Sequence, residues 1–358
     1  MIIDVDNQTM RWDIFCRVID NHGDLGVCWR LAADLGSRGE QVRLWIDDPL
    51  ALAWMAPRGA CGVNVVRWVD PLPAFEPGDV VVEAFGCDPP AAFVARMAAH
   101  AAAPLWINLE YLSAEAYAAR CHGLPSPQQC GPGAGLPKWF YYPGFTAESG
   151  GLLREAHALD AGEDGWLAAQ GVPLCDGERR VSLFAYADAP LEALCQRLDD
   201  RPTLLLLTAG AAQAPALMLF DGQGRRGRHL RAHALPWFDQ PGYDQLLRAC
   251  DLNFARGEDS IVRAMWAGAP FVWQIYAQTD LAHAAKLDAL LDRLTATATP
   301  ALADAVRGLW RAWNGLADWP ANLPDGPAWR GLCRSWRQRL VDQDDLSSQL
   351  LRFVAARR

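Results

Sequence analysis

Short apolar runs and segments with helical periodicity alternate along the chain from Trp12 onward. In the first half, apolar runs of strand length lie at residues 12–18, 42–46, 63–68, 79–85 and 105–109. Between them, residues 25–35 place their apolar side chains on one helical face, and residues 90–101 form a second helical pattern. Strands separated by helices imply βαβ crossovers, so we predict a mainly parallel sheet.

The same alternation starts again in the second half. Strand-like runs and helical patterns follow each other at residues 181–186, 191–198, 203–208, 243–250, 252–255, 260–267 and 270–275. From residue 280 onward the pattern is helical, apart from a break rich in Pro and Gly at residues 320–327. We therefore predict an α/β protein with two Rossmann-like halves in series, closed by helices, whose ligand binds in the cleft between the halves.

This alternation also gives the expected domain boundaries. We predict an N-terminal Rossmann-like domain at residues 11–160, a second Rossmann-like domain at 178–340, and a C-terminal helix at 341–358 that could pack back on the first domain. Periodicity disappears at residues 121–145, where Pro and Gly are frequent, and this predicts a long structured loop. The polar stretch 161–179 is expected to link the two domains.

Composition and charge narrow the possible classes of protein. With 358 residues, of which 51% are hydrophobic, the chain can bury a large core. The net charge of −9 argues against a nucleic-acid binder, because such proteins carry a basic face. We expect no membrane span, since the closest candidate, residues 203–220, is interrupted by Gly, Gln and Pro. The first residues carry Asp4 and Asp6 without the apolar core of a signal peptide, so we expect a cytoplasmic protein.

The ten cysteines include no C-x-x-C pair. Zinc sites usually contain such close pairs, because two ligands must reach one small ion. Several cysteines lie inside apolar runs, as Cys16, Cys28 and Cys195 do, and this favours buried reduced thiols. We therefore expect no metal site.

A first motif that could carry chemistry lies between the first strand and the first helix, at residues 18–26. It contains the carboxylates Asp20 and Asp24 beside glycines, which let a substrate approach the backbone. It lacks the full G-x-G-x-x-G of a dinucleotide-binding turn, and its acidic residues would repel a pyrophosphate. The alternative is that Asp24 only caps the helix, a common role of aspartate.

A second motif follows the strand at residues 252–255, where Arg256-Gly-Glu-Asp-Ser260 leads directly into a helix. The N–H groups of a first helical turn carry the positive end of the helix dipole and can hold a diphosphate. Ser260 would add a hydroxyl donor and Arg256 a forked cation, while Glu258 or Asp259 could accept hydrogen bonds from sugar hydroxyls. The alternative is a polar capping box with an exposed salt bridge.

The segment at residues 274–280 follows the next strand of the predicted parallel sheet. It should therefore lie on the same edge of the sheet as the Arg256 loop, with Tyr276 and Gln278 as candidate wall residues. The alternative is a plain surface turn.

The order of strand, acidic-Ser loop, helix, A-G-x-P, strand and Gln-containing turn resembles the donor half of a GT-B glycosyltransferase. More closely, the chain from Trp12 onward resembles the bacterial protein-arginine rhamnosyltransferases that modify translation elongation factor P, the EarP family. The residues that carry this resemblance lie at 12–16, 18–27, 29–31, 235–244 and 250–278. Such an extended match is far more specific than one short motif.

This resemblance implies an inverting transfer of rhamnose from dTDP-β-L-rhamnose to an arginine side chain of elongation factor P, with no cofactor and no metal ion. It assigns the acceptor-activating carboxylate to Asp24, supported by Asp20, and adds Glu258 to the catalytic residues. The residues that it implies for donor binding are Gly23, Phe184, Tyr186, Trp237, Gln240, Arg256, Gly257, Glu258, Asp259 and Ser260. Among these, Phe184 and Trp237 are the candidates for stacking on the base.

Physical chemistry agrees with this assignment. A guanidinium is a poor nucleophile while its charge is delocalised, and two close aspartates can clamp it and accept a proton as the nitrogen attacks. Two other hypotheses stay open at this point. One is a GT-B enzyme that glycosylates a small molecule or a glycan, and the other is a nucleotide-binding regulatory protein without chemistry.

Overall fold

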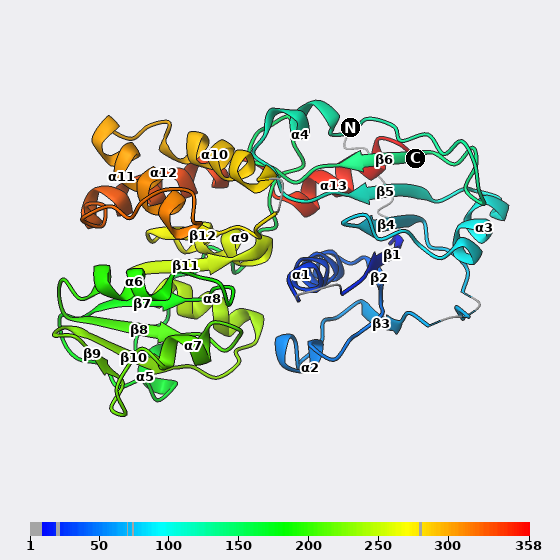
Figure 1. Ribbon diagram of the computed structural model, residues 1–358. Coiled ribbons are helices and arrows are strands. Elements are labelled where there is room, and N and C mark those ends of the chain that lie inside the picture. Colours follow the sequence, from blue (N-terminus) through cyan, green and yellow to red (C-terminus); the bar gives the residue numbers. More distant parts are fainter. Residues whose placement is uncertain (1–8, 19–21, 70, 74, 279–280) are drawn as a thin grey trace, which may run out of the picture. The chain divides into compact units, whose positions relative to one another are not determined.

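The computed structural model describes residues 9–18, 22–69, 71–73, 75–278 and 281–358. The chain divides into two compact units, each built around a six-stranded sheet. Unit 1 contains the chain up to Glu155 together with Gln343–Arg358, and unit 2 contains Ala156–Asp342. Two Rossmann-like α/β halves were predicted, and the two sheets confirm this fold class (Figure 1).

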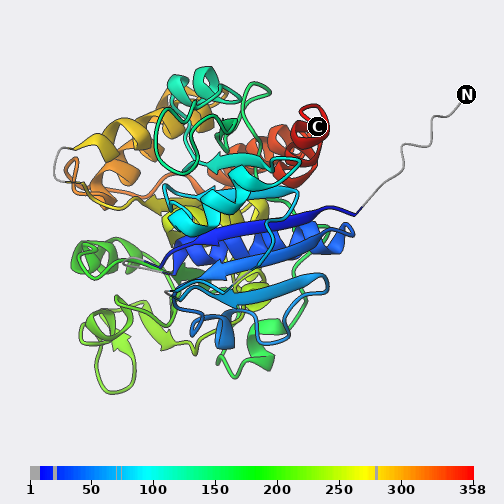
Figure 2. The same ribbon diagram turned by 90° about the vertical axis from the view of Figure 1, so that its right-hand side faces the viewer.

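The sheet of unit 1 is parallel throughout, and its strand order is β3-β2-β1-β4-β5-β6. Figure 2 turns this unit toward the viewer and shows its strands side by side. Strands β4 and β5 are buried along their whole length, as expected for central parallel strands covered on both faces. The elements of unit 1 are β1 (Arg11–Cys16), α1 (Gly23–Ser37), β2 (Gln41–Ile46), α2 (Leu52–Met55), β3 (Val63–Arg67), β4 (Val80–Ala84), α3 (Ala91–Ala99), β5 (Leu105–Leu109), α4 (Ala116–Cys121), β6 (Lys138–Tyr141) and α13 (Leu346–Ala355).

The sheet of unit 2 has the order β12-β11-β7-β8-β10-β9 and is parallel except for the short strand β9. Its strands are β7 (Arg179–Leu183), β8 (Thr203–Leu207), β9 (Arg225–Arg226), β10 (Leu230–Ala234), β11 (Leu252–Arg256) and β12 (Phe271–Gln274). Its helices are α5 (Trp166–Ala169), α6 (Leu191–Leu198), α7 (Gln213–Leu217), α8 (Gln240–Ala249), α9 (Gly257–Ala267), α10 (Ala282–Thr295), α11 (Pro300–Trp313) and α12 (Gly326–Val341). No helix in the described ranges is long and apolar enough to cross a membrane.

The predicted loop at residues 121–145 is wrong, because strand β6 lies inside it and pairs with β5. This strand begins with a buried lysine, Lys138, which forms an ion pair with the buried carboxylate of Glu83. Glu83 also accepts a hydrogen bond of 2.9 Å from the indole N–H of Trp106. A charged residue inside a sheet breaks the apolar pattern from which strands are predicted, and its partner on β4 is distant in sequence.

The stretch at residues 161–179 was predicted to link the domains, but it packs on unit 2. Leu167 and Val172 join a core cluster with Leu204 and Leu206 of β8. The chain passes between the units at residues 155–156 and 342–343, outside this stretch. The prediction failed here because a few apolar contacts to distant residues outweigh a locally polar sequence.

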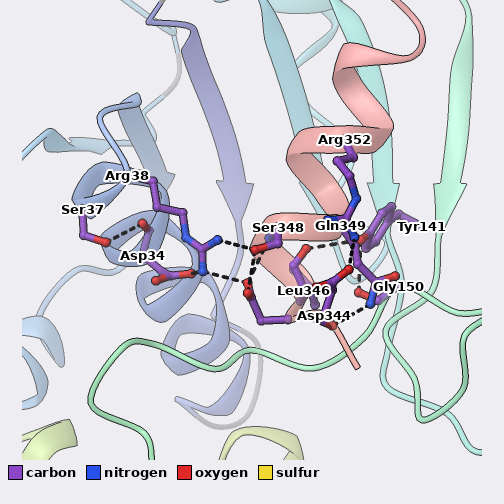
Figure 3. Close-up of polar contacts among 11 residues, drawn as sticks. Asp34, Ser37, Arg38, Tyr141, Gly150, Asp344, Leu346, Ser348, Gln349 and Arg352 are labelled. Carbon is purple, nitrogen blue, oxygen red and sulfur yellow. Dashed lines mark hydrogen bonds and ion pairs between the residues drawn. The ribbon is translucent and has the colours of Figure 1, made fainter. Parts of the chain in front are cut away.

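The C-terminal helix α13 belongs to unit 1 and is held there by apolar and polar contacts (Figure 3). Its buried side chains Leu346, Leu350 and Val354 join the core cluster of the unit 1 sheet. At the end of α1, the guanidinium of Arg38 donates 2.7 Å hydrogen bonds to Asp345 and to the hydroxyl of Ser348. The helix therefore completes the core of a unit from which it is separated in sequence by all of unit 2.

In unit 2, a buried ion pair joins the two helices that flank β11. The guanidinium of Arg263 on α9 donates two hydrogen bonds, of 3.2 and 3.1 Å, to the two carboxylate oxygens of Asp244 on α8. Both side chains are almost completely excluded from solvent. This bidentate pair fixes the orientation of α9 relative to α8, and so the place where α9 begins.

We expect Arg263→Met to lower the free energy of unfolding by roughly 3–5 kcal/mol, because the buried carboxylate of Asp244 then lacks this cation. Calorimetric unfolding of the full chain measures the loss. The control is the double variant Asp244→Leu/Arg263→Met, which replaces the pair by apolar groups of similar volume and should recover most of the stability. A double variant as unstable as Arg263→Met would contradict this interpretation.

Candidate active site

Asp24 lies in the first turn of α1, directly beyond the carboxyl end of β1. The cap position of this helix is His22, so Asp24 lies two residues beyond it, within the first turn. The phenol of Tyr111 donates a hydrogen bond of 3.3 Å to Oδ2 of Asp24. Apart from its chain neighbours and its own helix, no heavy atom of the described residues lies within 4 Å of the position that a Cβ would take on Gly23. Asp20, the predicted supporting carboxylate, lies outside the described residues.

A small cavity of about 150 Å³ opens beside Asp24 at the carboxyl ends of β1 and β4. The residues that line it are Arg17, Asp24, Ala84, Phe85, Gly86, Cys87 and Asp88. The lining contains two carboxylates, Asp24 and Asp88, and one cation, Arg17, so its formal charge is negative. Such a lining suits a further cation, because carboxylates bind the N–H groups of a guanidinium.

In unit 2, the side chain of Arg256 lies against two aromatic rings at the carboxyl end of β11. Its guanidinium carbon is 4.5 Å from the ring centroid of Phe184 and 4.7 Å from that of Tyr186. Burial lowers the pKa of Arg256, but an arginine keeps its charge at neutral pH. The edge of Tyr243 packs on Phe184 at a centroid distance of 5.7 Å. The rings therefore hold a cation in place at the start of α9.

Helix α9 begins at Gly257 without a side-chain cap hydrogen bond. Gly257 has a φ of +71°, a conformation that glycine adopts without strain. Glu258 does not form an exposed salt bridge, because its largely buried carboxylate accepts a hydrogen bond of 2.6 Å from Lys286 on α10. The alternative of a capping box with an exposed salt bridge is therefore wrong. Asp259 and the buried Ser260 complete the first turn.

Of the predicted donor residues, Phe184, Tyr186, Arg256 and Gly257 come together in one cluster. The Tyr186 hydroxyl lies 3.8 Å from the position that a Cβ would take on Gly257. The buried Gln240 begins α8, and Trp237 precedes this helix with half of its surface exposed. Both residues lie at the start of α8, the helix that precedes β11 in the chain, and β11 ends at Arg256.

One residue that positions this cluster, Gln274, was missed by sequence reasoning. The buried side chain of Gln274 accepts a hydrogen bond of 2.8 Å from the backbone N–H of Tyr186 and donates one of 3.3 Å to Asp188. Tyr276, a predicted wall residue, packs its ring edge against Tyr186 at 5.6 Å. The other wall candidate, Gln278, donates its backbone N–H to the ring of His283. The only sign of the role of Gln274 in the sequence is that this polar residue ends the otherwise apolar strand FVWQ.

The fold and the two clusters define a class, the GT-B glycosyltransferases. Among solved structures of this class, the glycosyltransferase VinC in complex with dTDP matches with a TM-score of 0.54 at 14% identity, over 98% of this chain and 100% of that chain. This likeness supports the fold alone. The described residues contain no group of three His, Cys, Asp or Glu side chains that could hold a metal ion, and all ten cysteines are free thiols.

Within this class, the chain belongs to the family described as "Elongation-Factor P (EF-P) rhamnosyltransferase EarP", whose model matches residues 12–355. The protein-arginine rhamnosyltransferase of Pseudomonas aeruginosa is 42% identical over 96% of this chain and 98% of its own length. A solved structure described as the structural basis for EarP-mediated arginine glycosylation of elongation factor EF-P is 30% identical, with a TM-score of 0.65, over 97% of this chain and 99% of that chain. The resemblance inferred from the sequence is confirmed, and the chain is a glycosyltransferase of this family.

We expect Arg256→Ala to weaken the binding of dTDP about 10- to 100-fold, because a charge-assisted hydrogen bond to an anion is worth roughly 1.5–3 kcal/mol. Titration calorimetry measures this affinity directly. Arg225→Ala is the matched control, since it removes an exposed arginine of the same unit from β9. Equal affinities of the Arg256→Ala variant and the unmodified protein would place the diphosphate elsewhere.

Proposed function

We propose that this protein transfers rhamnose from dTDP-β-L-rhamnose to an arginine side chain of translation elongation factor P, with inversion at the anomeric carbon and without a metal ion. The observation that carries this proposal is the match of nearly the whole chain to a family of EF-P rhamnosyltransferases. The geometry of the two clusters supports it, because one suits a guanidinium and the other suits a diphosphate.

On the acceptor side, the guanidinium of the substrate arginine binds in the cavity beside Asp24. Asp24, supported by Asp20, localises the guanidinium charge and accepts a proton as a terminal nitrogen attacks the anomeric carbon. A new C–N bond forms while the bond from the anomeric carbon to the diphosphate oxygen breaks. Attack from the face opposite the leaving group inverts the configuration. On the same side, the phenol of Tyr111 donates a hydrogen bond to Oδ2 of Asp24.

On the donor side, dTDP leaves with its diphosphate on the first turn of α9. The N–H groups of this turn, the hydroxyl of Ser260 and the cation of Arg256 stabilise the charge that develops on the leaving group. The backbone of Gly257 lets the diphosphate approach closely. Glu258, held by Lys286, and Asp259 accept hydrogen bonds from sugar hydroxyls. The other donor contacts in this unit are the base-stacking Phe184 and Trp237, together with Tyr186 and Gln240.

Arg256 also explains how the reaction can proceed without a divalent cation. Many transferases use a metal ion to neutralise the departing diphosphate. Here a guanidinium that packs against two aromatic rings supplies positive charge at the start of a helix. The proposed reaction should therefore continue in the presence of a strong chelator.

We expect Asp24→Asn to lower the transfer rate by about 10²- to 10⁴-fold, the usual contribution of a general base. The affinity for dTDP should stay nearly unchanged, since the proposed role of Asp24 lies on the acceptor side. Steady-state kinetics and calorimetry measure the two effects. Asp88→Asn, which removes another carboxylate from the same cavity, is the matched control and should lower the rate much less. A fully active Asp24→Asn enzyme would exclude the proposed role.

The substrates are tested by incubating purified elongation factor P with this protein, dTDP-β-L-rhamnose and EDTA. We expect intact-mass analysis to show a gain of one rhamnosyl group, and peptide mapping to place it on one arginine. A factor in which that arginine is replaced by lysine is the control. Consumption of the donor without a gain of mass would favour a small-molecule or glycan acceptor. Binding of dTDP without any consumption would favour a regulatory protein, and a reaction stopped by EDTA alone would favour a metal mechanism.

A further inference from the structure

Phe85 has an unusual backbone conformation directly after β4. In the described part of the chain, Phe85 and Leu281 are the only residues other than glycine with a positive φ, and that of Phe85 is +58°. A bulky L-residue is rarely found in this left-handed region, because its Cβ crowds the backbone. If only the turn were required here, glycine would adopt it without strain, as Gly86 does at the next position with a φ of +72°.

The surroundings hold Phe85 in this conformation. Its backbone N–H donates a hydrogen bond of 2.8 Å to the carbonyl oxygen of Leu109, at the end of β5. The N–H of Cys87 closes the turn by donating to the carbonyl oxygen of Ala84 at 3.0 Å. Both contacts use only backbone atoms, so the turn itself does not need a phenylalanine.

The side chain of Phe85, unlike its backbone, contacts another aromatic side chain. Its ring stacks on that of Tyr111 with a centroid distance of 4.7 Å and an interplanar angle of 23°. Tyr111 is 40% exposed, and the stacked ring of Phe85 packs against one face of its ring. The hydroxyl of Tyr111 in turn donates to Oδ2 of Asp24. Phe85, Tyr111 and Asp24 therefore form one chain of contacts, and its two ends line the same cavity.

We propose that Phe85 is a positioning residue, whose strained backbone places its ring where it holds Tyr111, and that Tyr111 orients the carboxylate of Asp24 toward the acceptor. This inference rests on the proposed function, in which Asp24 accepts a proton from the substrate arginine. Strained residues are typical of functional sites, where the surrounding structure maintains a conformation that the chain would not otherwise adopt. The strain at Phe85 thus serves the orientation of a carboxylate that is two contacts away, through the ring of Tyr111.

The test is a double-variant cycle with Phe85→Gly, Tyr111→Phe and the combination of the two. We expect each single variant to lower kcat for rhamnosylation of elongation factor P about 10- to 100-fold, as misplacement of a reacting group does, with an unchanged KM for the donor. If Phe85 acts through Tyr111, the combined variant is no slower than Tyr111→Phe alone. Phe85→Tyr, which keeps a stacking ring, should restore most of the rate.

Three results would overturn the inference: a normal kcat for Phe85→Gly, losses that multiply in the combined variant, or a failure of Phe85→Tyr to restore the rate. A second measurement does not depend on the substrate. A crystal structure of the Phe85→Gly variant should show Tyr111 displaced and its hydrogen bond to Asp24 lost, and an unchanged Tyr111 would equally overturn the inference. If the unmodified protein does not modify elongation factor P, the proposed function fails, and the crystal structure still decides the role of Phe85.

Discussion

The parallel direction of the strands is the constraint on which both candidate clusters depend. Helical crossovers return the chain to the same end of each sheet, so the loops that leave the carboxyl ends of its strands gather along one edge. In unit 1 this brings together residues that follow β1, β4 and β5, among them Asp24, Phe85 and Tyr111. In unit 2 it brings together residues that follow β7, β11 and β12. Neither cluster could form from neighbouring residues of one loop.

Neutral groups position the charged groups in both clusters. Aromatic faces hold Arg256, and the amide of Gln274 holds the backbone of Tyr186, one of those aromatic residues. A phenol contacts Asp24. A partly buried charge loses part of its hydration, and polar or aromatic neighbours offset this loss without neutralising the charge.

Prediction of the fold worked where a strand is apolar and failed where it is not. The strand at residues 105–109 and the helix at 191–198 have the predicted bounds, because their patterns reflect a buried sheet and an amphipathic helix. Strand β6 was missed because its first residue is a lysine neutralised by a carboxylate on another strand. For the candidate site too, local motifs could be predicted and contacts between distant residues could not. The junction at Arg256 could be predicted because a strand, a glycine and a helix follow one another in sequence, but the roles of Tyr111 and Gln274 arise from contacts across strands.

The sequence by itself determined the class of fold and the family, and it predicted the two loops proposed to carry the chemistry, because hydrophobic periodicity and contiguous motifs are local properties of the chain. Only the tertiary structure decided that Asp24 contacts Tyr111, that Arg256 packs against two aromatic rings, and that Glu258 pairs with Lys286. It also decided that the last helix completes the core of the first unit. The physical reason is that each of these contacts joins segments far apart in the chain, and their approach depends on how the sheets and helices pack as a whole.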